Sequence, residues 1–229
     1  MYEVEVKVRA AHGQVRERLA ALDAERVERV SQSDTYYAAP HREFAETDEA
    51  LRTRRETVID RGPAAGADGG PDPGGRLDAA GAATGADAAT DAETRLTYKG
   101  PRIDTESKTR EEHETAVADP AAAEGILDGL GFDPAATVEK ERDVYAVGEY
   151  VVTLDTVADL GEFVEVERTV EEADVDSARE GARALLRDLG LDPEEGIRTS
   201  YLELVAEARA DSDEEADDAD LHADSDAYE

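Results

Sequence analysis

The sequence predicts an α+β fold in which an antiparallel eight-stranded β-barrel has a polar interior and helices packed against its outside. Two observations support this prediction. Eight segments alternate in the manner of strands, and most of them are joined by short connections, which favours antiparallel pairing. Several of these segments carry charged residues at every second position, and closing the sheet would turn the charged rows toward one another while removing the sheet edges.

The first predicted strand, residues 2–9, shows the alternation most clearly. Glu3, Glu5 and Lys7 share one face, and Val4 and Val6 lie on the other. A strand with one solvated face would show the same pattern, so this strand alone leaves both interpretations open. Repetition of charged rows on later strands favours a polar barrel interior, which is then the candidate site.

The later predicted strands carry the rows that complete this interior. They cover residues 34–39, 50–58, 95–100, 109–117, 138–146, 150–155 and 163–169. Their charged rows consist of Arg52 and Arg54, of Lys99, of Arg110 with Glu112 and Glu114, of Lys140 and Arg142, and of Glu165 and Glu167. A plain solvated surface would not place both signs of charge on the same kind of face in so many strands.

Three further segments predict helices. Residues 11–23 have apolar residues at helical spacing. The second helix begins with Asp119 as N-cap and Pro120 in the first turn, and the third begins at Asp174 or Asp176. We expect the apolar stripes of these helices to cover the apolar outer faces of the strands.

Two segments interrupt or end this pattern. Residues 60–94 consist almost entirely of Ala, Gly, Asp, Pro and Thr, which predicts a disordered low-complexity insertion. Residues 206–229 are dominated by acids and predict a disordered acidic tail. We therefore expect one domain over residues 1–205, with the insertion inside it.

The chain is strongly acidic, because 58 Asp and Glu residues against 25 Lys and Arg give a formal net charge of −33. Such a charge disfavours binding to nucleic acid or to anionic membranes. High charge is also typical of disorder, but 40% apolar residues with clear periodicity favour a folded chain. The scarcity of lysine favours a halophilic, haloarchaeal-type protein, whose self-repulsion is screened when the Debye length falls to about 3 Å at ~1 M salt.

Several classes of protein are excluded by what the chain lacks. The absence of cysteine excludes disulfides, thiolate metal sites and thiolate nucleophiles. The N-terminus does not have the form of a secretory signal, and no apolar run approaches the ~20 residues of a membrane span. We therefore expect a cytoplasmic protein.

Several short motifs follow one another in a fixed order over residues 1–205. They are Glu3-Val4-Glu5-Val6-Lys7, which has the form ExExK, Thr97-Tyr98-Lys99-Gly100-Pro101, Lys140-Glu141-Arg142 and Leu160-Gly161-Glu162-Phe163-Val164-Glu165-Val166-Glu167. With this set the chain resembles the CYTH superfamily of triphosphate tunnel metalloenzymes, which groups class IV adenylyl cyclases with thiamine triphosphatases and inorganic triphosphatases. It is most similar to the class IV adenylyl cyclase branch. The resemblance implies a CYTH-like catalytic domain whose barrel forms a tunnel for a triphosphate and a divalent metal.

The charged rows suit the task that this resemblance implies. A triphosphate bears about four negative charges, so that basic side chains of the interior would bind its oxygens. The expected substrate-binding residues are Lys7, Arg52, Arg54, Lys99, Arg110, Lys140 and Arg142. The expected catalytic residues are Glu3, Glu5 and Lys7, with Glu3 or Glu5 holding the attacking water if the enzyme is a hydrolase.

Carboxylates among so many cations need a separate reason, because they would repel phosphate. Mg²⁺ or Mn²⁺ supplies one, since these hard cations bind oxygen ligands and join carboxylate to phosphate. The expected metal ligands are Glu3, Glu5, Glu165 and Glu167 as first choice, and Asp155, Glu112 and Glu114 as second choice. A salt bridge to a neighbouring arginine is the alternative for each of these acids.

The residues leave three functions open. The first is a class IV adenylyl cyclase-like enzyme, which converts ATP to cyclic AMP and pyrophosphate. The second is a triphosphatase acting on inorganic triphosphate, thiamine triphosphate or nucleoside triphosphates. The third is a non-catalytic sensor of polyphosphate or nucleotides, but anion binding alone would not need the carboxylates. The expected partner is a triphosphate-containing small molecule, with no nucleic acid and no membrane, and a homodimer stays open.

Overall fold

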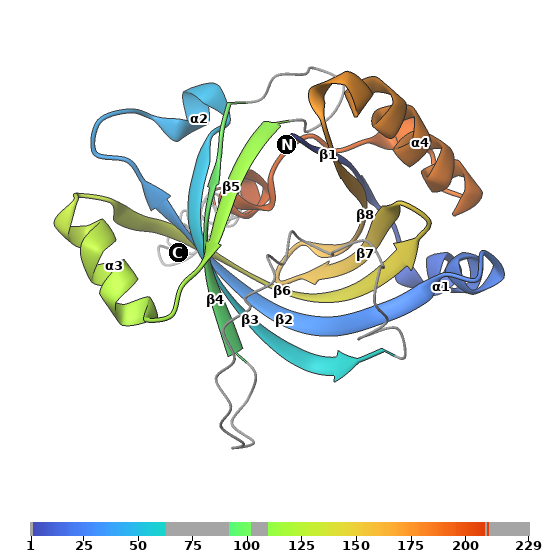
Figure 1. Ribbon diagram of the computed structural model, residues 1–229, viewed down its shortest axis with the longest axis horizontal. Coiled ribbons are helices and arrows are strands. Elements are labelled where there is room, and N and C mark those ends of the chain that lie inside the picture. The colour runs from blue at the N-terminus through green and yellow to red at the C-terminus, as the bar shows by residue number, and fades with distance from the viewer. Residues whose placement is uncertain (1, 63–91, 102–109, 209, 211–229) are drawn as a thin grey trace, which may run out of the picture.

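The computed structural model describes residues 2–62, 92–101, 110–208 and 210, and these form a closed β-barrel (Figure 1). Its strands are hydrogen-bonded in the order β1-β5-β4-β3-β2-β6-β7-β8, with β8 returning to β1, and every pairing is antiparallel. The predicted fold class is therefore confirmed. The strands are β1 (Tyr2–Arg9), β2 (Glu25–Ala38), β3 (Ala50–Arg61), β4 (Ala92–Lys99), β5 (Arg110–Ala116), β6 (Asp133–Val147), β7 (Tyr150–Val157) and β8 (Gly161–Val170).

Within the described residues, four α-helices connect or follow the strands. They are α1 (His12–Ala21), α2 (Phe44–Thr47), α3 (Pro120–Gly129) and α4 (Val175–Asp188), and a helical segment follows at residues 201–208. Short 3₁₀ turns lie at Glu172–Asp174 and Pro193–Glu195. No helix in the described ranges is long and apolar enough to cross a membrane.

The main difference from the predicted elements is the start of β2. This strand begins at Glu25 and not at residue 34, because the added stretch pairs with β6 from Glu25 and also with β3 from Glu28. In this stretch the two valines, Val27 and Val30, are three residues apart, which hides the strand period of two. Pairing with two neighbours thus decides the conformation of a polar segment whose own sequence does not indicate a strand.

The two predicted disordered segments lie mostly outside the described residues. Residues 63–91 and 211–229 are not described, and the predictions made for them remain predictions. At the edges the predicted bounds are too wide. Strands β3 and β4 extend into the predicted insertion, to Arg61 and from Ala92, and residues 206–208 of the predicted tail are helical.

The outer face of the barrel is apolar where α1 and α4 cover it. Val6, Val152 and Val164 pack in one buried cluster with Leu19 of α1 and Leu186 of α4. Figure 1 shows these two helices on the same side of the barrel, beside β1, β7 and β8. Because side chains alternate along a strand, this packing turns the charged residues of the same strands inward.

The helix α3 covers the barrel less than its sequence predicts. Its Asp119 does act as N-cap, accepting a hydrogen bond from the amide of Ala122 at 3.0 Å. Of its apolar residues, Leu127 is buried, whereas Ile126 and Leu130 are 62% and 63% exposed. The apolar stripe of this helix is therefore wider than the surface against which it packs.

Candidate functional site

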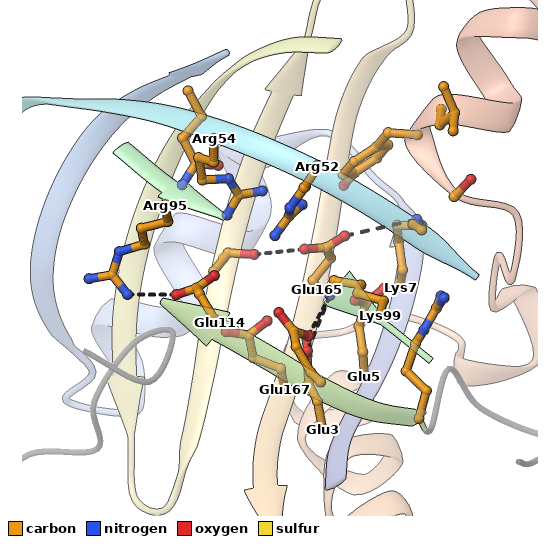
Figure 2. Close-up of a pocket in the computed structure, with 18 of the residues that line it drawn as sticks. Glu3, Glu5, Lys7, Arg52, Arg54, Arg95, Lys99, Glu114, Glu165 and Glu167 are labelled. Atoms are coloured by element: carbon orange, nitrogen blue, oxygen red, sulfur yellow. Dashed lines mark hydrogen bonds and ion pairs between the residues drawn. The ribbon is translucent and has the colours of Figure 1, made fainter. Parts of the chain in front are cut away.

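The barrel encloses a cavity of about 1050 Å³. Charged side chains from seven of the eight strands line it, and the remaining strand, β7, contributes Val151 and Thr153. The predicted charged rows therefore do meet in the interior. Figure 2 shows Glu3, Glu5 and Glu167 on one side of this cavity and Arg52 and Arg54 across from them.

Three carboxylates gather at one place in the wall. One oxygen from each of Glu3, Glu5 and Glu167 can be chosen so that all three lie within 4.8 Å of one another. The grouping follows from the register, because Glu5 pairs with Glu167 across the β1–β8 ladder and Glu3 lies two residues along β1. These are three of the four first-choice metal ligands.

The electrostatics of this carboxylate cluster favour a bound cation. Burial, and then repulsion by Glu112, raises the pKa of Glu3 from 4.5 to about 7. Burial, and then repulsion by Glu3, raises the pKa of Glu167 from 4.5 to about 8. Carboxylates that are buried and repel one another are stabilised by a hard divalent cation such as Mg²⁺ or Mn²⁺, which binds oxygen ligands.

The fourth first-choice ligand, Glu165, lies in a different environment. Its carboxylate is 3.9 Å from Lys7 Nζ and accepts a hydrogen bond from Arg142 Nη2. Burial alone would raise the pKa of Glu165, but Arg142, Lys140 and Lys7 outweigh it and hold the pKa well below its usual range. This carboxylate is neutralised by cations and stands apart from the cluster of Glu3, Glu5 and Glu167.

Two buried aspartates accept hydrogen bonds from the arginines that line the cavity. Asp155, which is 0% exposed, accepts two hydrogen bonds of 2.6 Å from Arg142, and Lys140 Nζ lies 3.3 Å away. Asp34, which is 1% exposed, accepts hydrogen bonds of 2.6 and 2.7 Å from Arg54 and one of 3.1 Å from Arg52. Neither aspartate is among the residues that line the cavity.

The pKa directions of these aspartates agree with that arrangement. Burial alone would raise the pKa of Asp34, but Arg54 and Arg52 outweigh it and hold the pKa far below its usual range. Burial acts on Asp155 in the same way, and Arg142 and Lys140 lower its pKa overall. Both aspartates are therefore charged, and they fix the positions of four cations.

The second-choice ligands Glu112 and Glu114 also pair with cations. Lys99 Nζ lies 2.7 Å from Glu112 and 3.2 Å from Glu3. Burial would raise the pKa of Glu112, but Lys99 outweighs it, so that the pKa falls to about 2. Glu114 accepts hydrogen bonds from Arg95 at 2.6 Å and from Thr97 at 2.8 Å.

The predicted phosphate ligand Arg110 is tied to the segment that follows α2. Its Nη1 donates to the backbone carbonyl of Asp48 at 2.6 Å, and its Nη2 lies 3.8 Å from the Asp48 carboxylate. Arg110 lines the cavity, but its partner is Asp48 in a loop and not a buried aspartate of the barrel.

Four further residues of the interior were not named as candidates from the sequence, namely Gln32, Asp34, Arg95 and Tyr201. Tyr201 comes from the last helical segment and makes cation–π contacts with two lysines, since its ring centre is 4.1 Å from Lys7 Nζ and 5.0 Å from Lys140 Nζ.

Burial, and then repulsion by Arg142, lowers the pKa of Lys140 to about 8.

The raised pKa values predict a pH dependence of stability. Since Glu3 and Glu167 have a higher pKa when folded than the usual 4.5, the folded state binds extra protons between pH 4.5 and about 8. The stability that these two groups contribute is therefore fully present below pH 4.5, and it is lost as the pH rises from there through 7 to 8. We expect the metal-free protein to lose more stability between pH 5.5 and 8.5 than the variant Glu167→Gln does, as measured by urea unfolding with a chelator. Equal losses would contradict the assigned pKa of Glu167.

Known proteins share the sequence and the fold of this chain. The sequence matches the CYTH domain over residues 1–201. A protein of Methanocaldococcus jannaschii named "Putative adenylate cyclase" is 32% identical over 206 residues, which are 89% of this chain and 98% of that protein. A solved protein structure from Pyrococcus horikoshii is 34% identical with a TM-score of 0.71, covering 90% of this chain and 98% of that one.

A more distant structure shares the fold alone. It is that of a Hippeastrum protein with a dominant triphosphatase activity, which is 17% identical with a TM-score of 0.53. The similarity covers 88% of this chain and 92% of that one.

Proposed function

Because this chain belongs to the CYTH domain family, we propose that it is a divalent-metal-dependent enzyme of the class IV adenylyl cyclase type, which converts ATP to cyclic AMP and pyrophosphate. The observation that carries the proposal is the cluster of Glu3, Glu5 and Glu167, which faces Arg52 and Arg54 across the cavity (Figure 2). The similarity of the Methanocaldococcus jannaschii protein, over nearly its whole length, supports the cyclase assignment.

The three clustered carboxylates fit a divalent cation. All their donor atoms are oxygens, and burial with repulsion by neighbouring carboxylates raises the pKa of Glu3 and Glu167 although Lys99 lies 3.2 Å from Glu3. Glu3, Glu5 and Glu167 would hold Mg²⁺ or Mn²⁺ there, and the cation would withdraw charge from the phosphate. The same three residues would be of little use to a protein that only binds an anion, which argues against a sensor.

The cations opposite the cluster are placed to bind the triphosphate. Arg52, Arg54 and Arg142 are held in fixed orientations by Asp34 and Asp155. Because these side chains are already ordered, they lose little conformational entropy when they bind phosphate oxygens. The hydrogen bonds that they donate are charge-assisted and therefore strong. Lys7 and Lys99 add compact positive charges beside the cluster, and Lys140 adds one next to Arg142.

In the proposed reaction, the 3′-hydroxyl oxygen of the ribose forms a bond to the α-phosphorus. The bond from that phosphorus to the bridging oxygen of the β-phosphate breaks, and pyrophosphate leaves with the electron pair. The hydroxyl proton passes to a carboxylate of the cluster, for which Glu3 and Glu5 of β1 are the candidates. Lys7 and the arginines stabilise the charge that develops on the phosphate oxygens.

A triphosphatase is the second candidate, and the fold similarity to the Hippeastrum protein with triphosphatase activity gives a reason to test it. The same charges would serve attack by water on the terminal phosphorus. The two reactions differ in which phosphorus meets the nucleophile and in whether the tunnel also holds a nucleoside.

Product analysis separates the two candidates. We would incubate the full chain with Mg²⁺ or Mn²⁺ and either ATP or tripolyphosphate, at ~1 M salt because screening at that concentration offsets the acidic self-repulsion. Cyclic AMP with pyrophosphate would support the cyclase. Orthophosphate from tripolyphosphate without any cyclic nucleotide would replace it by the triphosphatase, and no turnover of either compound would contradict the proposed function.

A further inference from the structure

One part of the tunnel is walled by three valines. Val30 of β2, Val144 of β6 and Val151 of β7 line the cavity and are nearly fully buried. On each of these strands the valine lies six residues from a member of the apolar cluster around Tyr201, which contains Tyr36, Val138 and Val157. At ~3.3 Å per residue, the valine wall is about 20 Å along the strands from that cluster.

The charged centre of the tunnel lies between these two apolar parts. On β6 it consists of Lys140 and Arg142, which line the cavity. Beside β2 it consists of Arg52 and Arg54 of β3, which line the cavity and are held by the buried Asp34 of β2. Along β2 and β6, therefore, the interior changes from apolar to charged and back to apolar. A plain tripolyphosphate site would not need the second apolar part.

Hydrogen-bond acceptors stand beside the valine wall. Gln32 is 4% exposed, lines the cavity next to Val30, and donates from Nε2 to Glu56 Oε2 at 2.6 Å. Since the Glu56 carboxylate can only accept, it fixes the orientation of the amide, and the Gln32 carbonyl oxygen is left over. That buried oxygen accepts no hydrogen bond from the residues that the structure describes.

These features repel phosphate and suit a different group. The carboxylates of Glu28 and Glu56 line the cavity there and would oppose a phosphate's charge. The cations Arg54 and Arg95, which are near, are held by Asp34 and Glu114. Apolar walls with one oriented acceptor are typical of a site for a flat ring that carries a hydrogen-bond donor at its edge.

We propose that the region lined by Val30, Val144, Val151 and Gln32 is the subsite for the nucleobase of the substrate, and that Gln32 Oε1 accepts a hydrogen bond from the exocyclic amine of adenine. The proposal rests on the proposed function, since it places the base beside a triphosphate bound by the central cations. Gln32 lies two residues from Asp34 on β2, which is ~7 Å along the strand, so that base and phosphates would lie close enough to be joined by a ribose.

The experiment compares three ligands by titration calorimetry with the full chain and Ca²⁺ in place of Mg²⁺ or Mn²⁺, since Ca²⁺ also binds oxygen ligands but with a larger and less regular geometry. The ligands are ATP, inosine triphosphate, in which a carbonyl replaces the amine, and tripolyphosphate, which has no base. We expect wild type to bind ATP about tenfold more tightly than inosine triphosphate, because the carbonyl would face the Gln32 oxygen without a hydrogen bond.

Two variants test the acceptor itself. Gln32→Leu should remove the preference for ATP while it leaves tripolyphosphate affinity within twofold. Glu56→Gln frees the amide to turn over, so it should reduce the preference by improving the binding of inosine triphosphate. Gln14→Leu, on the exposed surface of α1, is the matched control, and circular dichroism verifies folding.

The possible results are distinguishable. Equal binding of ATP and inosine triphosphate by wild type, with tripolyphosphate still bound, would overturn the subsite and leave the triphosphate site standing. A preference that survives in both variants would also overturn it. If wild type binds none of the three ligands, the proposed function fails and the subsite fails with it.

Discussion

Replacing Glu167 by glutamine is expected to lower kcat/KM for triphosphate turnover by at least ~100-fold and to weaken Mn²⁺ binding by a similar factor. The amide keeps the size of the side chain but loses its charge, and it leaves only Glu3 and Glu5 as carboxylate ligands in the cluster. The affinity is measured by titration with Mn²⁺, and the activity by release of pyrophosphate or orthophosphate. The metal titration gives a readout that does not depend on turnover.

The matched control is Glu165→Gln, two residues earlier on the same strand. Its carboxylate contacts Lys7 and Arg142 and not the cluster, so the substitution should leave Mn²⁺ affinity within about threefold and should reduce stability because it leaves buried cations short of a partner. Glu171→Gln, at an exposed position after β8, should change neither quantity. An equal loss of Mn²⁺ affinity in the Glu165 and Glu167 variants would show that the cluster is not the metal site.

The difference between Glu165 and Glu167 marks the limit of the sequence argument. Both belong to one charged row, and alternation correctly places both inside the barrel. Their roles are separated by the neighbouring strand, because Glu165 pairs with Lys7 and Glu167 with Glu5 in the β1–β8 register. Since sequence alone does not give this register, it cannot tell a metal ligand from a carboxylate that belongs to a salt bridge.

The same reasoning explains what was missed on β2. The strand alternation that identifies β1 is absent before residue 34, so that Gln32 could not be placed on an inner face before the pairings with β3 and β6 were known. Asp155 was expected as a metal ligand of second choice, but it lies behind Arg142 and away from the cavity lining. Charge and spacing predict which residues enter the barrel, whereas the order of strands around it decides which charges meet.

Replacing Asp34 by asparagine is expected to reduce the free energy of unfolding by about 3–5 kcal/mol, because it leaves Arg52 and Arg54 buried without their carboxylate. Tripolyphosphate should restore part of this stability, since its oxygens can take over the two guanidinium groups, and its stabilising effect should be larger in the variant than in wild type. Both effects are measured by urea unfolding in ~1 M salt, where the Debye length of about 3 Å screens the surface charges.

The control for this experiment is Asp60→Asn on β3. Asp60 is largely exposed and pairs with Arg26 at 2.7 Å, so its loss should cost no more than about 0.5–1 kcal/mol. A loss below about 1 kcal/mol for Asp34→Asn would mean that the arginines find other partners, which would contradict their fixed orientation toward phosphate. If the loss is large and tripolyphosphate restores none of it, Asp34 supports the fold alone. Recovery in the variant would connect the buried aspartate to the triphosphate site, because only a ligand that reaches Arg52 and Arg54 can replace the missing charge.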